Sequence, residues 1–252
     1  MEMTEHLKLI DNFVESWNSI VVPIYGKKSN DNRYYGIGSG FLVNFKKEIF
    51  LVTCLHVVEC AKNYKGVFGI FNGNGITFHE KNFYIDKDND IATTHLDAKF
   101  ANENKLEKVK AFPFEKDKSE YKESGLYFFM GYPSSKNVLS TVGGFDRRLQ
   151  SYSIDVHKRT NAETKINKNI AFYFDAKSML TTNLEKKIPP TLNGVSGGPL
   201  LSISILENDY GIDFSLILVG VFSEWYQNKK KIVFTEVSAV TDLLNDVCGT
   251  LE

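Results

Sequence analysis

The chain has 252 residues, 42% hydrophobic and 24% charged, and its 30 basic and 31 acidic side chains give a formal net charge of −1. This composition supports one compact soluble body with a sizeable core, and the balanced charge gives no global field favouring nucleic acid or an anionic membrane. No stretch approaches the ~18 apolar residues of a membrane span, and the N-terminus lacks signal-peptide character. Together with the balanced charge, this predicts a cytoplasmic protein without nucleic-acid or membrane partners.

Residues 1–19 predict an amphipathic helix. Apolar side chains recur at spacings of three and four after Thr4, a suitable N-cap, and these are Leu7, Ile10, Phe13, Val14 and Trp17. We expect this stripe to pack on the body of the protein, and docking of a partner is the alternative.

Short β-strands follow, separated by polar turns. In the first half they are expected at residues 20–25, 40–43, 68–71, 76–78 and 83–85. Together they predict a first β-barrel over residues 20–115. A charged, apolar-poor stretch at 102–123 is expected to connect it to a second unit, with the boundary near residue 115.

The second half repeats the pattern. Strands are expected at residues 125–132, 149–155, 170–174, 216–222 and 231–236, which predict a second β-barrel over 116–236. Ser238 is the expected N-cap of a terminal helix within residues 237–252. The fold class is therefore all-β, with one helix at each end.

Three segments carry the residue types of nucleophilic catalysis. His56 follows the apolar run 49–53, Asp90 immediately precedes the apolar pair Ile91 and Ala92, and Ser196 lies within Gly-Val-Ser-Gly-Gly-Pro-Leu at 194–200. A serine hydroxyl attacks a carbonyl only when an imidazole takes its proton and a carboxylate fixes the imidazole tautomer. We predict that His56 is the base, Asp90 its orienter and Ser196 the nucleophile, with Asp86 as the alternative acid.

Glycines surround the predicted nucleophile. Acyl transfer creates an oxyanion that requires preorganised N–H donors, and glycines allow the tight turn that aims them. We assign these donors to the backbone N–H groups of Gly194 and Ser196.

These segments resemble the chymotrypsin/trypsin-like peptidase family, especially bacterial catalytic modules of the Deg and HtrA type. The resemblance rests on six segments that follow in order and span most of the chain: 38–43, 51–57, 86–92, 129–133, 194–200 and 219–223. It implies two six-stranded antiparallel β-barrels, with His56 and Asp90 from the first and Ser196 from the second. The active site would then lie in the cleft between them.

The order of the residues separates this family from other serine hydrolases. Gly194 to Gly198 also fits the nucleophile elbow of α/β-hydrolases, but that fold places its histidine after the serine, and all five histidines here precede Ser196. A subtilisin-like order would require the aspartate before the histidine, and no motif ahead of His56 supports one.

The family resemblance also implies a substrate pocket. Pro190 occupies the position at the base of the pocket, where it supplies no charge for a basic side chain. The segment 222–226 would form the pocket wall and the strand that pairs with substrate, through Phe222, Ser223, Glu224 and Trp225. We expect Trp225 to narrow the pocket toward small or medium apolar side chains, whereas a shift of one residue would place Glu224 there. Val195 replaces the aspartate used for activation by N-terminal cleavage in secreted relatives.

The three cysteines, Cys54, Cys60 and Cys248, are predicted to be reduced thiols. Zinc binding by Cys54, His56 and Cys60 is disfavoured because three ligands are too few and a metal on His56 would occupy the lone pair of the base. We therefore predict no metal and no cofactor.

The predicted activity is that of a serine endopeptidase acting on polypeptides. The chain leaves no room for a peptide-binding PDZ domain, so control is expected from its own loops at 104–123 and 180–193, from assembly or from a regulatory protein. Two alternatives remain: a protease effector activated by a partner or signal, as in bacterial defence, and a non-catalytic peptide-binding pseudoprotease.

Overall fold

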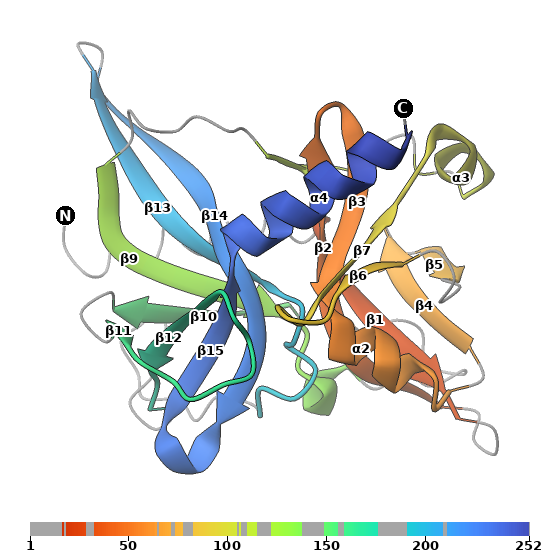
Figure 1. The fold of residues 1–252 in the computed structure, drawn as a ribbon, viewed down its shortest axis with the longest axis horizontal. Coiled ribbons are helices and arrows are strands. Elements are labelled where there is room, and N and C mark those ends of the chain that lie inside the picture. Colours follow the sequence, from red (N-terminus) through yellow and green to blue (C-terminus); the bar gives the residue numbers. More distant parts are fainter. Residues whose placement is uncertain are drawn as a thin grey trace.

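Two β-sheets lie side by side in the computed structural model, with a long C-terminal helix running from one across to the other (Figure 1). The structure describes residues 17, 19–28, 33–64, 66–71, 74–77, 83–104, 106, 110–114, 122–137, 149–155, 159–175, 191–208 and 211–251. The predicted fold class, a pair of antiparallel β-barrels, is confirmed.

The first sheet is built from the N-terminal half. Its strand order is β5-β4-β1-β2-β3-β7-β6, and β8 pairs in parallel with β2 while the other pairs are antiparallel. The strands are β1 (Val21–Lys27), β2 (Tyr34–Phe45), β3 (Glu48–Cys54), β4 (Gly66–Phe71), β5 (Asn74–Thr77), β6 (Tyr84–Asp86), β7 (Ile91–His95) and β8 (Phe112–Pro113).

The second sheet is antiparallel throughout, in the order β10-β9-β13-β14-β15-β12-β11. Its strands are β9 (Lys122–Gly131), β10 (Gln150–Asp155), β11 (Arg159–Thr160), β12 (Asn169–Tyr173), β13 (Pro199–Asn208), β14 (Gly211–Tyr226) and β15 (Lys231–Glu236). Counted over the described residues, the sheets contain eight and seven strands instead of the six each expected, because short segments such as β8 and β11 add to them.

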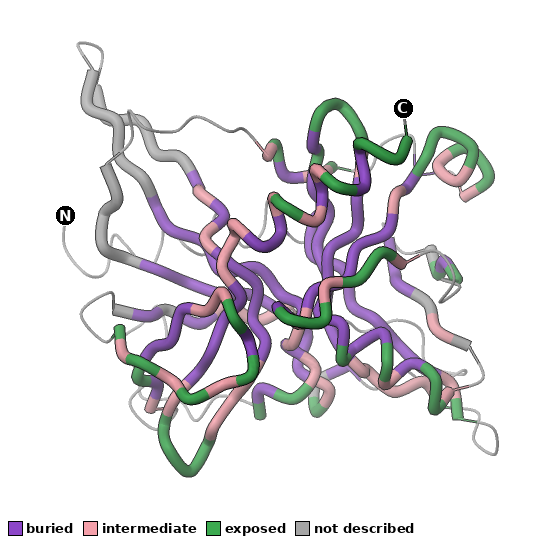
Figure 2. Tube along the Cα trace, viewed as in Figure 1, coloured by how far each residue is buried: buried purple, intermediate pink, exposed green. Residues whose placement is uncertain are grey.

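The interior is apolar because alternate side chains of both sheets face inward. One cluster joins the barrels, since first-sheet residues such as Phe41 pack in it together with Met130 and Leu201 of the second. The second barrel also has an aromatic core, in which Phe129 stacks on Tyr152 at 4.7 Å and on Phe222 at 5.2 Å. Figure 2 shows this buried region continuing through the middle of the molecule, where the barrels meet.

In the part of the chain that the structure describes, three α-helices and two short 3₁₀ turns connect or cover these strands. They are α2 (Leu55–Ala61), α3 (Ala98–Glu103), α4 (Val237–Leu251), η2 (Ser134–Lys136) and η5 (Gln227–Lys229). The apolar face of α4 buries Val240, Leu244 and Val247 in the cluster shared by the two barrels. Burial of each such side chain contributes about 1.5–3 kcal/mol, so α4 stabilises the packing of one barrel on the other.

Some predicted features differ from the structure or lie outside its described residues. Ser238 is not an N-cap but the second residue of α4, and its hydroxyl donates to Glu236 at 3.4 Å. Of the predicted N-terminal stripe only Trp17 is described, and it packs on Phe112 with ring centroids 4.8 Å apart. The barrel boundary near residue 115 and most of both predicted regulatory loops also lie outside the described residues. Among the described helices, none has the length and apolar character needed to cross a membrane.

Candidate active site

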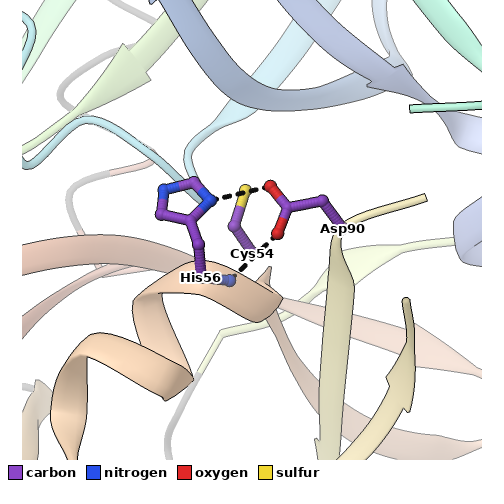
Figure 3. Close-up of side chains that lie close together, drawn as sticks. All are labelled: Cys54, His56 and Asp90. Atoms are coloured by element: carbon purple, nitrogen blue, oxygen red, sulfur yellow. Dashed lines mark hydrogen bonds and ion pairs between the residues drawn. The ribbon is translucent and has the colours of Figure 1, made fainter. Parts of the chain in front are cut away.

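Asp90 and His56 are in direct contact. Asp90 Oδ2 lies 2.7 Å from His56 Nδ1, and Asp90 Oδ1 accepts the backbone N–H of His56 at 2.9 Å (Figure 3). Because a carboxylate only accepts hydrogen bonds, Nδ1 carries the proton of the neutral imidazole and the Nε2 lone pair stays available. The two residues therefore have the arrangement of a general base and its orienting acid.

The first sheet builds this pair from two neighbouring elements. β3 ends at Cys54 and α2 begins at once, so His56 lies in the first turn of the helix, where backbone N–H groups have no partner within the helix. Asp90 ends the turn between β6 and β7, and its carbonyl oxygen accepts the N–H of Leu55 at 3.0 Å. The aspartate thus caps α2 and holds the imidazole at the same time.

Asp86, the alternative acid, has a different role. Its Oδ1 accepts the backbone N–H groups of Asp88 at 3.0 Å and Asn89 at 3.1 Å, and its Oδ2 accepts the Asn89 amide at 2.6 Å. Asp86 therefore builds the turn that presents Asp90.

The turn that carries Ser196 is fixed by hydrogen bonds to both barrels. The N–H of Gly197 donates to Phe222 O at 2.8 Å, and the N–H of Ser39 donates to Ser196 O at 2.7 Å. Ser39, which is fully buried, also donates from its hydroxyl to Gly194 O at 2.8 Å. The sequence alone does not indicate this role of Ser39, although the residue lies in the motif segment 38–43.

Glycine is required at two positions of this turn. Gly194 and Gly197 have φ of +88° and +87°, a region that other residues rarely adopt. A Cβ at Gly197 would lie 2.0 Å from Ser39 O, and one at Gly194 would lie 2.7 Å from the backbone nitrogen of Ser134. The close approach of these neighbours, together with the backbone conformation, explains the glycines around Ser196.

The predicted oxyanion donors, Gly194 and Ser196, lie in this turn. The carbonyl of Asn193 accepts both the N–H and the hydroxyl of Ser134, at 2.7 and 2.8 Å. Because the N–H of a trans peptide points opposite its carbonyl, these bonds direct the N–H of Gly194 away from Ser134. Within the described part of the chain, neither Gly194 nor Ser196 donates its backbone N–H to another backbone carbonyl outside the regular elements.

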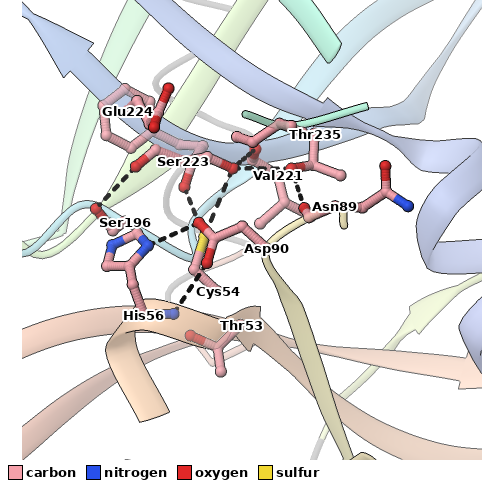
Figure 4. Close-up of polar contacts among 12 residues, drawn as sticks. Thr53, Cys54, His56, Asn89, Asp90, Ser196, Val221, Ser223, Glu224 and Thr235 are labelled. Carbon is pink, nitrogen blue, oxygen red and sulfur yellow. Dashed lines mark hydrogen bonds and ion pairs between the residues drawn. The ribbon is translucent and has the colours of Figure 1, made fainter. Parts of the chain in front are cut away.

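The hydroxyl of Ser196 donates to Ser223 O at 3.4 Å. No hydrogen bond joins it to His56, although Figure 4 shows Ser196 beside the imidazole that Asp90 holds from the other side. The structure thus brings the three predicted catalytic residues into one site, with the serine side chain oriented toward β14.

The predicted substrate strand lies next to Ser196. β13 pairs with β14 only as far as Val221, opposite Pro199, and β15 pairs with the other edge of β14 as far as Tyr226. Among the described strands, residues 224–226 therefore pair on one edge only, and Ser223 lies at the register shift between Phe222 and Glu224. Phe222 is buried in the aromatic core, which places its side chain behind the catalytic turn and not on an exposed pocket wall.

Glu224 is engaged by two hydroxyl groups. Its Oε2 accepts Thr164 Oγ1 at 2.7 Å and the Tyr226 hydroxyl at 2.6 Å. Burial, and then the hydrogen bond to Glu224, raises the pKa of Tyr226, which therefore remains a donor at neutral pH. Trp225 is partly buried and packs against the aromatic core, whereas Pro190 lies outside the described residues.

Cys54 completes a compact group with His56 and Asp90, in which ligand-type atoms lie within 4.8 Å of one another. Burial, and then the charge of Asp90, raises the pKa of the Cys54 thiol well above its usual range. The thiol donates to Phe222 O at 3.2 Å, whereas a metal would require the thiolate. His56 Nδ1 is already bonded to Asp90, so the trio is poorly suited to a resident metal. None of the three cysteines, all of which lie in the described part of the chain, forms a disulfide.

Comparison with known proteins identifies the family. Residues 18–244 match the family described as Trypsin, and because this match covers most of the chain, the protein belongs to the trypsin family of chymotrypsin-like serine proteases. No curated protein sequence gives a significant match.

Solved structures with a similar fold include viral and other proteases. The serine protease domain of the Sesbania mosaic virus polyprotein is 17% identical, with a TM-score of 0.46 over 89% of this chain and 91% of that chain. A Glu endopeptidase is 14% identical, with a TM-score of 0.48 over 91% and 90%. The tobacco etch virus protease is 11% identical, with a TM-score of 0.44 over 87% and 80%.

Proposed function

We propose that this trypsin-family protein is an active serine endopeptidase that cleaves polypeptides through an acyl-enzyme on Ser196. The observation that carries this proposal is the His56–Asp90 pair, which lies beside the turn bearing Ser196 and leaves Nε2 of the imidazole free. Membership of the family supports peptide bonds as the substrate.

In the proposed reaction, Ser196 Oγ forms a bond to the carbonyl carbon of the substrate while its proton passes to His56 Nε2. The N–H groups of Gly194 and Ser196 stabilise the oxyanion. His56 then protonates the leaving amine as the C–N bond breaks. Water attacks the acyl-enzyme with His56 again as base, releasing the acid and restoring the Ser196 hydroxyl.

The substrate is proposed to add as a strand along residues 223–226 of β14. The edge next to the catalytic turn offers main-chain groups for antiparallel pairing, and Ser223 O already lies within 3.4 Å of Ser196 Oγ. Pro190 and Trp225 are proposed to define an apolar pocket for the residue whose carbonyl is attacked.

A protease effector activated by a partner or signal is the second candidate. The hydrogen bond from Ser196 to Ser223, in place of one to His56, favours it, because the nucleophile must turn before it can transfer its proton. In this proposal a regulatory protein promotes the productive orientation. The six motif segments support a module of the bacterial Deg and HtrA type, and cysteines that form no disulfide among the described residues suit a reducing cytoplasm.

An alkyl fluorophosphonate probe distinguishes the candidates. Labelling of the purified wild type, and its absence in Ser196→Ala, supports the active endopeptidase. Labelling only after a partner or lysate fraction is added supports the regulated effector. Failure of the wild type to label under every condition, with the fold intact by circular dichroism, would contradict both and support a pseudoprotease.

A further inference from the structure

Asn89, the residue before Asp90, uses its polar groups to connect the two barrels. It is 8% exposed, and it donates its backbone N–H and its side-chain amide to Asp86 at 3.1 and 2.6 Å. Its Oδ1 accepts the backbone N–H of Lys168 at 2.8 Å, and its carbonyl oxygen accepts the Thr235 hydroxyl at 2.8 Å. We call these four hydrogen bonds the Asn89 clasp.

The clasp joins segments that are distant in the sequence. Asp86 ends β6 of the first barrel, whereas Lys168 immediately precedes β12 and Thr235 lies in β15 of the second barrel. A neighbouring bond from the N–H of Asn167 to Asp88 O, at 3.0 Å, reinforces the contact. The turn that presents Asp90 is therefore held by the opposite barrel as well as its own.

This contact bears on the backbone conformation of Asp90. Asp90 has φ of +52°, a left-handed conformation that costs a non-glycine residue about 1–2 kcal/mol. The peptide before it is fixed at the Asn89 carbonyl by Thr235, and the peptide after it is fixed at the Asp90 carbonyl by Leu55. The surroundings thus determine the plane of both peptides, and with them the direction of the carboxylate toward His56.

Thr235 also connects the clasp to the strand beside the nucleophile. A hydroxyl has one hydrogen, and that of Thr235 is directed to Asn89 O, so the 2.9 Å contact between Thr235 and Ser223 has Ser223 as donor. The carbonyl of Ser223 in turn accepts Ser196 Oγ. Figure 4 shows this connection running from Ser196 through Ser223 and Thr235 to Asn89.

We infer that Asn89 is a positioning residue for catalysis: the second barrel, through Thr235 and the Lys168 backbone, sets the conformation of Asp90 and hence the direction of the His56 imidazole. This inference rests on the proposed function. It means that packing of the two barrels is coupled to the geometry of the base and does more than form the cleft.

A charge exchange tests the inference without removing bulk. Asn89→Asp places two carboxylates against each other at positions 86 and 89, and Asp86→Asn places two amides there, so each single change breaks the side-chain hydrogen bond of the clasp between these two residues. The double variant Asp86→Asn with Asn89→Asp restores one donor and one acceptor at the same distance and keeps the net charge of the native pair. We expect each single variant to lose about 100-fold in kcat, because small misplacements of catalytic groups have effects of this size, and the double variant to recover to within tenfold of wild type.

Thr235 provides an independent test from the second barrel. Thr235→Val removes the hydroxyl and keeps the shape, whereas Thr235→Ser keeps the hydroxyl. We expect kcat to fall with KM little changed in Thr235→Val, and to be largely retained in Thr235→Ser. Asp242→Asn is the matched control, since it breaks the ion pair with the Lys168 side chain and leaves the backbone donor of Lys168 in place.

The NMR resonance of the His56 Nδ1 proton gives a readout that altered stability alone would not change. The inference predicts that this resonance shifts or broadens in Asn89→Asp and returns in the double variant. It is overturned if folded single variants keep the wild-type kcat and resonance, or if the double variant recovers thermal stability without recovering kcat. Failure of the proposed function is separate, because the wild type itself would then neither label with the fluorophosphonate nor cleave peptides.

Discussion

The hydroxyl of Ser196 is directed to the carbonyl of Ser223, 3.4 Å away, while the imidazole beside it is held by Asp90. The second barrel thus carries the proposed nucleophile on a turn braced by β14, and the first barrel carries the proposed base on α2. In the proposed mechanism, a rotation of the Ser196 side chain takes its hydroxyl from the Ser223 carbonyl to His56.

Asp90→Asn should abolish most activity with little loss of fold. An asparagine amide favours the wrong imidazole tautomer, so kcat is expected to fall by about four orders of magnitude. Asp88→Asn, in the same turn and with the same change of charge, is the control and should retain activity within a few-fold. Peptide hydrolysis followed at pH 7 measures both, and comparable loss in the two variants would contradict the assignment of Asp90.

Ser134→Ala should impair the oxyanion site. Without its hydroxyl, the Asn193 carbonyl loses one of two donors, so the peptide that presents the Gly194 N–H is held less firmly. The loss of one neutral hydrogen bond corresponds to about tenfold, which we expect in kcat and in affinity for a peptide boronic acid, with KM nearly unchanged. Ser134→Thr keeps the hydroxyl and should therefore keep kcat and boronic-acid affinity near the wild-type values. The neighbouring Ser135→Ala should behave as wild type.

Gly197→Ala should destabilise the protein. The added Cβ would meet Ser39 O at 2.0 Å, and the residue would have to keep φ at +87°. Backbone strain and overpacking together predict a loss of about 3 kcal/mol in the free energy of unfolding, measured by urea denaturation. Gly249 lies in the exposed last turn of α4, where a new Cβ would have no atom within 4 Å. Gly249→Ala should instead raise the free energy of unfolding by up to about 1 kcal/mol. Equal effects of the two changes would show that the catalytic turn tolerates a side chain.

Cys54 should make stability fall at alkaline pH. Its pKa in the folded state is raised by burial and by Asp90, so the native state retains a proton that the unfolded state releases. The contribution of the buried thiol to the free energy of unfolding is complete below the ordinary thiol pKa of about 8.5. It is lost progressively as the pH rises from there toward the pKa that the thiol has in the folded protein. Relative to Cys54→Ala, the wild type should lose up to about 1.4 kcal/mol per pH unit above that point. Parallel pH profiles of the two proteins would show that the thiol does not titrate in this way.

The fold class and the residues that gather at the candidate site are predictable from sequence because both have local signatures. His56, Asp90 and Ser196 each lie in a short motif, and alternating apolar residues marked most strands. The sequence does not set β13 apart as a strand, because its first residues, Pro199 and Leu200, belong to the motif at 194–200. The helix α2 was missed although the spacing of Leu55, Val58 and Ala61 indicates a helical face.

Other features depend on contacts between distant segments and leave no local pattern. Ser39 orients the turn of Ser196, and Thr235 anchors Asn89, only because strands from both barrels meet there. Ser238 has the residue type of an N-cap, but β15 continues into α4 without a break, so the helix begins at Val237, two residues before the start that an N-cap at Ser238 implies. Ser39 and Thr235 are small, polar and fully buried, and their roles follow from that burial.

Intact-mass spectrometry during turnover of an activated ester tests the central claim most directly. The account predicts one acyl group per chain, located on Ser196 by peptide mapping, formed in a burst and lost on hydrolysis, with none on Ser196→Ala. Acylation of Ser196→Ala at the wild-type rate, or turnover by the wild type with acyl groups only on other residues, would contradict it.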